Sequence, residues 1–163
     1  MNTQEKTRYV PAIVLAASIA LVAPGWEAGA QTSGSSIVEG KTAQGFPYMM
    51  GGVGSEERAA MESHAGNYNV KLAFAEKAGV YLANIDVFVH HRSGREILNV
   101  TTNGPWLYLH LPPGVYNIRA AFDDKIQRIS DLVVKPGRRA ARILRWDLPQ
   151  DFPIYARLKE GKN

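Results

Sequence analysis

Apolar and polar side chains alternate along much of residues 68–148, and this period of two limits the possible folds more than any other feature. In the first such stretch, Tyr68, Val70, Leu72 and Phe74 alternate with small or polar neighbours. Successive side chains of a β-strand point to opposite faces, whereas a helix would scatter these four around its axis. The stretch therefore predicts a strand with one buried face.

Further stretches of this kind follow, and residues that favour turns separate them. The stretches cover residues 81–89, 97–101, 106–111, 116–122, 126–134 and 140–148. The separating segments include Asn103-Gly104-Pro105 and Pro112-Pro113-Gly114, whose residue types suit tight turns. Short strands at regular spacing are typical of a β-sandwich. We therefore predict an all-β fold, a seven-stranded antiparallel Greek-key sandwich over residues 68–149.

One short helix is expected ahead of the sandwich. Ser55 can cap its start, and Glu56 and Glu57 would lie at its positive end. The preceding glycine-rich segment, Gly51–Gly54, resembles a phosphate cradle, but two acidic residues follow it and the Gly-Lys-Ser/Thr ending of a P-loop is missing. We therefore assign residues 46–67 to a loop plus a short helix, without a phosphate site.

Residues 1–30 have the three parts of a signal peptide. Lys6 and Arg8 give a basic start, residues 12–23 are apolar, and Ala28-Gly29-Ala30 offers the small residues that a signal peptidase accepts. A membrane-spanning helix needs about 20 apolar residues, and this run is shorter. We expect cleavage near Ala30, with retention as an anchor as the alternative.

A polar segment lies on either side of the sandwich, and the whole chain contains no Cys. Residues 31–45 are rich in Gly and Ser and are expected to form a flexible linker, while residues 150–163 form a C-terminal tail. Secreted eukaryotic domains of this size usually carry disulfides, so the absence of Cys favours a bacterial periplasm or medium. Attachment through a lipid would also require a Cys directly after the signal-peptide cleavage site, and the chain has none. We expect a periplasmic or secreted protein with no stable membrane anchor after cleavage.

Several motifs resemble carboxypeptidase regulatory-like domains. They are Ile85-Asp86-Val87-Phe88-Val89, Ser93-Gly94-Arg95-Glu96, Leu111-Pro112-Pro113-Gly114-Val115-Tyr116 and Leu132-Val133-Val134-Lys135-Pro136-Gly137. The resemblance covers about residues 68–148 and implies a prealbumin-like, that is transthyretin-like, sandwich. Such domains are usually non-catalytic modules, attached to other proteins or standing alone in the envelope. It therefore implies an exported, non-catalytic module that binds an envelope protein or glycan.

The side chains that could carry chemistry form no catalytic motif. Ser55, Ser63, Ser93 and Ser130 lie in no Gly-x-Ser-x-Gly elbow. Transthyretin-like hydroxyisourate hydrolases end in Tyr-Arg-Gly-Ser, whereas this chain has Tyr155-Ala156-Arg157-Leu158. Intradiol dioxygenases use a His-x-His element, which His90-His91 does not reproduce. We therefore predict no catalytic residues and no cofactor, with a hydrolase or dioxygenase on this scaffold as an alternative.

A small zinc- or copper-binding protein is the other alternative. His90 and His91 are adjacent on a predicted strand, so they point to opposite faces and cannot share one metal. His90 and His110 could face each other if their strands were neighbours, and Asp86 could then complete a site. These three are weak candidates, because their spacing matches no recognised metal motif and they would also suit the solvent side of strand ends.

Two groups of residues are candidate partner surfaces. Trp106 and Tyr108 lie opposite the leucine face of their strand, so they either pack under the segment of residues 45–66 or form an exposed platform for a sugar or a partner. Arg138, Arg139 and Arg142 belong to a late basic cluster in a chain of net charge +4. The cluster could attract anionic envelope polymers or lipid headgroups, or form a solvated strand face. The bases are too sparse for nucleic acid.

Overall fold

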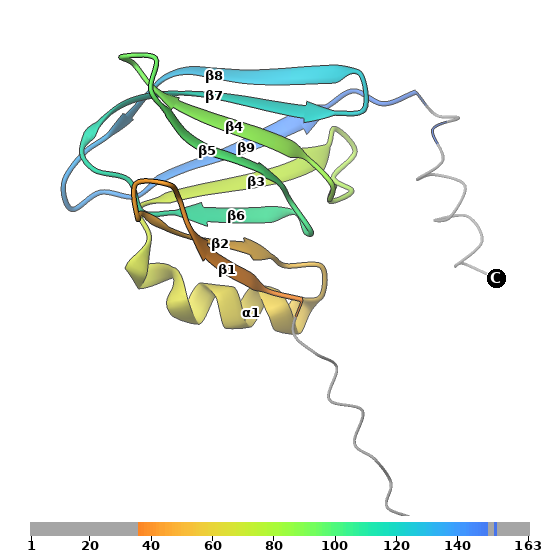
Figure 1. Ribbon diagram of the computed structural model, residues 1–163. Helices are drawn as coiled ribbons and strands as arrows, with labels where there is room; N and C mark the ends of the chain where they lie inside the picture. Colours follow the sequence, from red (N-terminus) through yellow and green to blue (C-terminus); the bar gives the residue numbers. More distant parts are fainter. Residues whose placement is uncertain (1–35, 150–151, 153–163) are drawn as a thin grey trace, which may run out of the picture. The chain divides into compact units, whose positions relative to one another are not determined.

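The computed structural model describes residues 36–149 and Phe152, and it places most of them in two β-sheets with one α-helix (Figure 1). The described strands are β1 (Val38–Lys41), β2 (Pro47–Gly51), β3 (Val70–Glu76), β4 (Asp86–His91), β5 (Glu96–Thr101), β6 (Trp106–Leu109), β7 (Gly114–Phe122), β8 (Lys125–Val134) and β9 (Ala140–Trp146). Between β2 and β3 lie α1 (Ser55–His64) and the 3-10 turn η1 (Ala65–Asn67). The predicted signal peptide, and the predicted tail except Phe152, lie outside the described residues.

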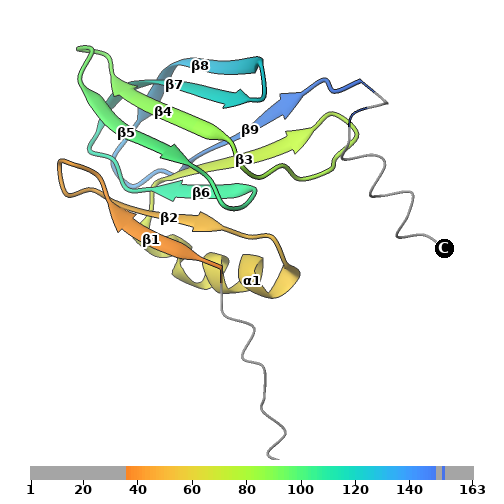
Figure 2. The same ribbon diagram turned by 45° about the vertical axis from the view of Figure 1, so that its right-hand side comes forward.

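The strands form two sheets that face each other across a common core (Figure 2). The strand order is β1-β2-β6-β3-β9 in the first sheet, sheet A, and β5-β4-β7-β8 in the second, sheet B. The all-β prediction is therefore confirmed. Each expected stretch contains a strand, β3 to β9, although β4 begins only at Asp86, after Asn84 turns the chain with a φ of 57°.

The prediction of a purely antiparallel sandwich is wrong at one pair of strands. β3 and β9 pair in parallel, with Val70 opposite Ala140 and Glu76 opposite Trp146. All other pairs in the two sheets are antiparallel. After β3 the chain forms β4 and β5 in sheet B, returns to sheet A for β6, and forms β7 and β8 in sheet B. It then returns to sheet A as β9, which runs parallel to β3. Alternation within a strand does not encode this long-range direction.

The predicted linker and loop contain two strands that the sequence analysis did not foresee. β1 lies inside residues 31–45, and β2 lies inside residues 46–67. β2 pairs with β6, while β1 pairs only with β2. Both segments are short and contain Gly, and β2 begins with Pro, so local propensity is weak. The edge of β6 supplies the pairing that makes β2 a strand, and β2 in turn supplies it for β1.

The main core lies between the sheets and follows the alternation. The buried faces include Val70, Leu72 and Phe74 of β3 and Val87 and Val89 of β4, all without exposed surface. Outside sheet A, α1 covers a second and smaller core, which contains Met49, Met61, Ala65, Tyr68, Ala73, Trp106 and Tyr108. Sheet A is therefore buried on both faces where α1 lies over it.

The start of α1 explains the glycine-rich segment before it. Gly54, not Ser55, is the N-cap residue of the helix. The carboxylate of Glu57 accepts the N–H groups of Gly52 and Val53, both at 3.1 Å. Glu57 also accepts hydrogen bonds from the backbone N–H and the hydroxyl of Ser36, and the bond from the hydroxyl is the largest cause of its lowered pKa. The loop thus holds an anion from its own chain, the carboxylate of Glu57.

The Leu111–Tyr116 turn is closed by a buried tyrosine. Tyr116 is 2% exposed, and its hydroxyl donates to the carbonyl of Pro112 at 2.8 Å. This bond joins the first of the two prolines to the strand that follows, much as a tyrosine corner does in other sandwiches. The turn is therefore structural.

Replacing Tyr116 with phenylalanine should lower the free energy of unfolding by about 1–2 kcal/mol, because it leaves the Pro112 carbonyl without its partner. Urea denaturation followed by circular dichroism measures the loss. Tyr81→Phe is the matched control, because that ring is 47% exposed, and its stability should stay within about 0.5 kcal/mol of the parent. Equal stabilities of the two variants would contradict the role of the hydroxyl.

Candidate anion-binding site

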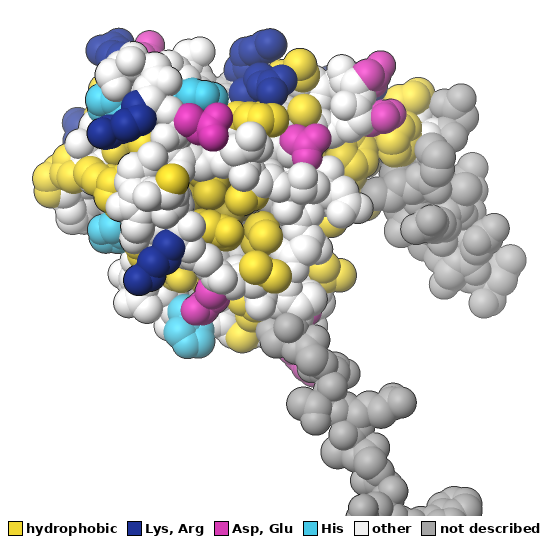
Figure 3. Space-filling view, in the orientation of Figure 1, with side chains coloured by type: hydrophobic (Ala, Val, Ile, Leu, Met, Phe, Trp, Pro, Cys, Tyr) yellow, Lys and Arg dark blue, Asp and Glu magenta, His cyan; other side chains and the backbone are white. Residues whose placement is uncertain are grey.

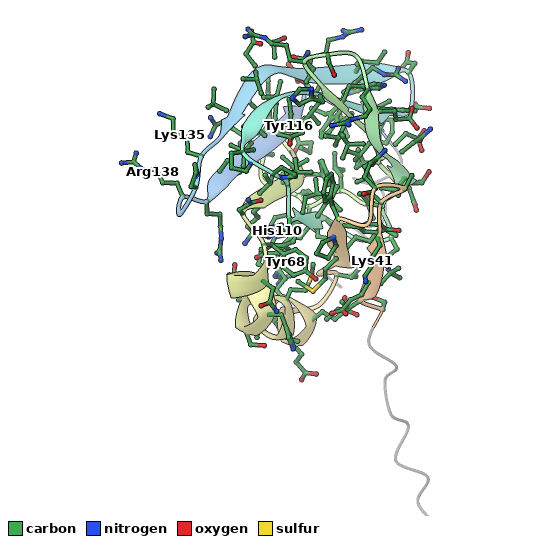
Figure 4. All side chains as sticks on the ribbon, turned by 60° about the vertical axis from the view of Figure 1, so that its left-hand side comes forward. Lys41, Tyr68, His110, Tyr116, Lys135 and Arg138 are labelled. Carbon is green, nitrogen blue, oxygen red and sulfur yellow. The ribbon has the colours of Figure 1, made fainter. Side chains whose placement is uncertain are left out.

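The turn between β8 and β9 forms one wall of a small basic pocket. The pocket has a volume of about 210 Å³ and is lined by Val133, Lys135, Arg138, Arg139, Ala140 and Arg142. All of its charged lining residues are basic. Figure 4 shows Lys135 and Arg138 projecting outward from this turn. The structure thus brings the three predicted arginines together with Lys135, which belongs to the same basic run of the sequence.

The β9 side of the pocket is anchored by Asn69, which precedes β3. The backbone carbonyl of Asn69 accepts the N–H of Ala140 at 2.8 Å. The side chain of Asn69 bonds both backbone groups of Leu111, donating at 2.7 Å and accepting at 2.9 Å. One residue therefore ties the start of β9 to β3 and to the Leu111–Tyr116 turn, so the pocket wall is held in place.

Arg139 is fixed in the pocket by the end of the helical segment. Its guanidinium donates to the carbonyl of Ala65, directly after α1, where the helix dipole favours a cation. Its charge also helps to keep the pKa of Glu62 low, although the hydrogen bond from Lys71 is the larger cause. Arg139 thus serves the fold and the pocket together.

The other cations of the pocket have no acidic partner in the described part of the chain. None of the ion pairs found among residues 36–149 includes Lys135, Arg138 or Arg142. The guanidinium of Arg142 makes one hydrogen bond, to the carbonyl of Ala141 at 2.8 Å. Several uncompensated cations around one small hollow raise the local positive potential.

The chemistry of the pocket suits an oxyanion on a partly apolar body. Guanidinium groups offer forked N–H donors that match carboxylates and phosphates, and a lysine adds a point charge. Val133, which is 50% exposed, and Ala140 provide an apolar wall. The pocket can therefore hold an anionic group while its carrier contacts the apolar side.

The prediction of Trp106 and Tyr108 as an exposed platform is wrong. Trp106 is 9% exposed and Tyr108 is fully buried, because α1 lies over both. The ammonium of Lys71 lies 3.5 Å from the centre of the Trp106 ring and pairs with Glu62 on the helix. The alternative expectation, packing under the helix segment, is confirmed.

The hydroxyl of Tyr108 is a buried polar group of this second core. It makes no hydrogen bond of standard geometry within the described residues. Burial and then the nearby Glu62 carboxylate raise the pKa of Tyr108, so the ring stays neutral. It does not line the basic pocket, and nothing here gives it a chemical role.

The candidate metal ligands do not come together. His90 lies on β4 in sheet B, whereas His110 follows β6 in sheet A, so their strands are not neighbours. The Nδ1 of His110 donates to the carbonyl of Asn67 at 3.1 Å, and Asp86, at the opposite end of β4, accepts the Thr101 hydroxyl at 2.6 Å. Among the described residues, no three His, Asp or Glu side chains are grouped to hold a metal.

A serine and a histidine that the sequence analysis did not pair lie together at the β4–β5 turn. The Oγ of Ser93 is 2.9 Å from Nδ1 of His91. The same nitrogen accepts the backbone N–H of Ser93 at 3.2 Å, which makes the contact a local turn closure. No carboxylate is seen to contact His91 in the described chain. The pair lacks the third group that would orient a catalytic base.

The fold and the pocket together define a two-sheet β-sandwich with a basic surface pocket. Comparison with known protein families finds no family model that matches the chain, and comparison with curated proteins finds no match either. Over the described residues, no helix has both the length and the apolar character to cross a membrane.

Proposed function

We propose that this protein is a non-catalytic, exported β-sandwich module that binds an acidic glycan of the bacterial envelope. One observation carries the proposal. The turn between β8 and β9 gathers Lys135, Arg138, Arg139 and Arg142 around a hollow that no acidic residue lines. Among the described residues, none of these four cations forms an ion pair. An external anion would supply the missing negative charge.

The size of the pocket favours a glycan over a protein partner. At about 210 Å³ it is smaller than the roughly 300–1,000 Å³ that encloses a drug-sized ligand, so it would hold a single charged unit. A stable protein complex would instead cover about 800 Å² on each partner. A chain of acidic sugars presents such units one after another. A lone carboxylate-bearing sugar residue therefore fits the pocket best.

The resemblance to carboxypeptidase regulatory-like domains supports a non-catalytic role. We infer a prealbumin-like, Greek-key arrangement for β3 to β9, to which β1 and β2 add an extension of sheet A. The Leu-Pro-Pro-Gly-x-Tyr turn supports this assignment, because the Tyr116 hydroxyl stabilises it through Pro112. Export to the periplasm or medium is supported by the three-part signal of residues 1–30.

The binding test uses the full chain and oligogalacturonate at low salt, with affinity measured by isothermal titration calorimetry. The Lys135→Gln/Arg138→Gln double variant should bind at least tenfold more weakly, because it removes two unpaired cations from the pocket. The affinity of the parent should also fall as salt rises.

Arg145→Gln is the control for net charge, because it removes an exposed cation of β9 that does not line the pocket. Its affinity should remain within twofold of the parent. Equal losses of affinity in the control and in the double variant would mean that the pocket is not the specific binding site for the glycan. Tighter binding of polyglutamate than of oligogalacturonate would instead indicate an acidic protein segment as the ligand.

A further inference from the structure

The outer face of sheet B carries a row of four side chains in register. Asn99 of β5 lies opposite Phe88 of β4, Phe88 lies opposite Arg119 of β7, and Arg119 lies opposite Arg128 of β8. Their chain neighbours Val87, Val89, Ile118 and Ala120 belong to the core between the sheets. Because side chains alternate along a strand, the row of four points away from the core.

Two arginines stand directly opposite each other in this row. Like charges in such a cross-strand pair repel and destabilise a sheet. In the part of the chain that the structure describes, neither Arg119 nor Arg128 takes part in an ion pair. The guanidinium of Arg119 lies 4.1 Å from the centre of the Phe88 ring, a cation–π contact that holds it against the sheet.

Three acidic residues of β4, β5 and β8 near the row contact other side chains. Asp86 accepts the hydroxyl of Thr101, and Asp131 pairs with Arg92 at 2.9 Å. Glu96 lies 3.7 Å from the ring of His90. Figure 3 shows Lys and Arg side chains, with Asp and Glu side chains among them, along the top of the domain, where Figure 1 places sheet B. The arginine pair thus remains a cationic spot with room for an external anion.

The basic pocket borders the face of the molecule that carries the arginine pair. Val133, which lines the pocket, lies on the outer face of β8, because its neighbours Leu132 and Val134 are buried in the core. Arg128 lies five positions earlier, at most about 17 Å away, and it points to the same face because a register shift between β7 and β8 adds one residue to β8 between Ile129 and Leu132. Asp131 lies between them, but Arg92 balances its charge.

We propose that Arg119 and Arg128 form a second subsite for the acidic glycan, and that the sugar chain runs along β8 from the basic pocket to this pair. The ligand class rests on the proposed function, whereas the arginine pair is an independent observation. When one end of a long sugar chain is bound in the pocket, its other units are held at a high effective concentration near the arginine pair, so the chain binds more tightly. The protein would thus select polymeric over short acidic glycans.

The test compares digalacturonate with long oligogalacturonates of more than ten sugar units, using the full chain at low salt. The parent should bind the long chains at least tenfold more tightly, per chain, than digalacturonate. In the Arg119→Gln/Arg128→Gln variant, affinity for the long chains should fall at least fivefold, whereas that for digalacturonate, held in the pocket, should change less than twofold. The thermal midpoint of the variant should not fall, because the substitution relieves repulsion.

Arg95→Gln, which removes a turn cation outside the row, controls for net charge and should leave both affinities within twofold of the parent. Unchanged long-chain binding in the Arg119→Gln/Arg128→Gln variant would overturn the second subsite while the pocket stands. If this variant loses binding and the Lys135→Gln/Arg138→Gln variant does not, the arginine pair is the main binding site and the pocket is not a binding site. That result would overturn the proposed path of the sugar chain along β8.

Discussion

Replacing Trp146 with alanine is expected to lower the free energy of unfolding by about 4 kcal/mol. Trp146 is fully buried in the main core, and its ring centre lies 6.3 Å from those of Phe74 and Phe122. Its indole N–H donates to the carbonyl of Lys125 at 3.0 Å. Phe74 belongs to sheet A, and Phe122 and Lys125 belong to sheet B. One side chain therefore joins the two sheets, and its loss leaves a large cavity.

Equilibrium denaturation in urea, followed by circular dichroism, measures this loss. Trp146→Phe keeps an aromatic ring but removes the indole donor, so it should cost less than the alanine variant, about 2 kcal/mol, and remain folded. Ile143→Ala is the control on the same strand, because Ile143 is 58% exposed and should change stability by less than about 0.5 kcal/mol. Similar losses at Trp146 and Ile143 would contradict the assigned core.

Replacing Gly104 with alanine is expected to cost about 3 kcal/mol. Gly104 lies in the turn between β5 and β6, against the end of β2. A Cβ at this position would lie 2.7 Å from the Cα of Gly51 and closer still to its carbonyl group. These are backbone atoms, so no side chain can move aside. The pairing of β2 with β6, which joins Gly51 to Trp106, would be strained.

Thermal unfolding measures this effect, and the midpoint should fall by about 12 °C or more for a domain of this size. Gly66→Ala is the matched control, because no atom lies within 4 Å of a Cβ added there. Its midpoint should shift by less than about 4 °C. If Gly104→Ala unfolds at the same temperature as Gly66→Ala, the close approach of the turn to β2 is not present in solution.

The amino-acid sequence by itself determined the approximate positions of β3 to β9 within residues 68–149 and the side of these strands that faces the core between the sheets. Alternation places Val70, Leu72 and Phe74 on one face, and the structure buries all three between the sheets. The basic character of the β8–β9 turn was also visible, since its cations are close along the chain. These features are local, and a period of two fixes them before any tertiary contact forms.

Tertiary structure alone decided how these strands are arranged and what lies over them. Pairing of β2 with β6, and of β1 with β2, turned the predicted loop and linker into strands, and the return of β9 made a parallel pair with β3. The covering helix buried Trp106 and Tyr108, and the division into two sheets separated His90 from His110. The Arg119–Arg128 pair likewise depends on strand register. Such contacts join residues far apart in sequence, and local patterns do not encode which strand edges and faces will meet.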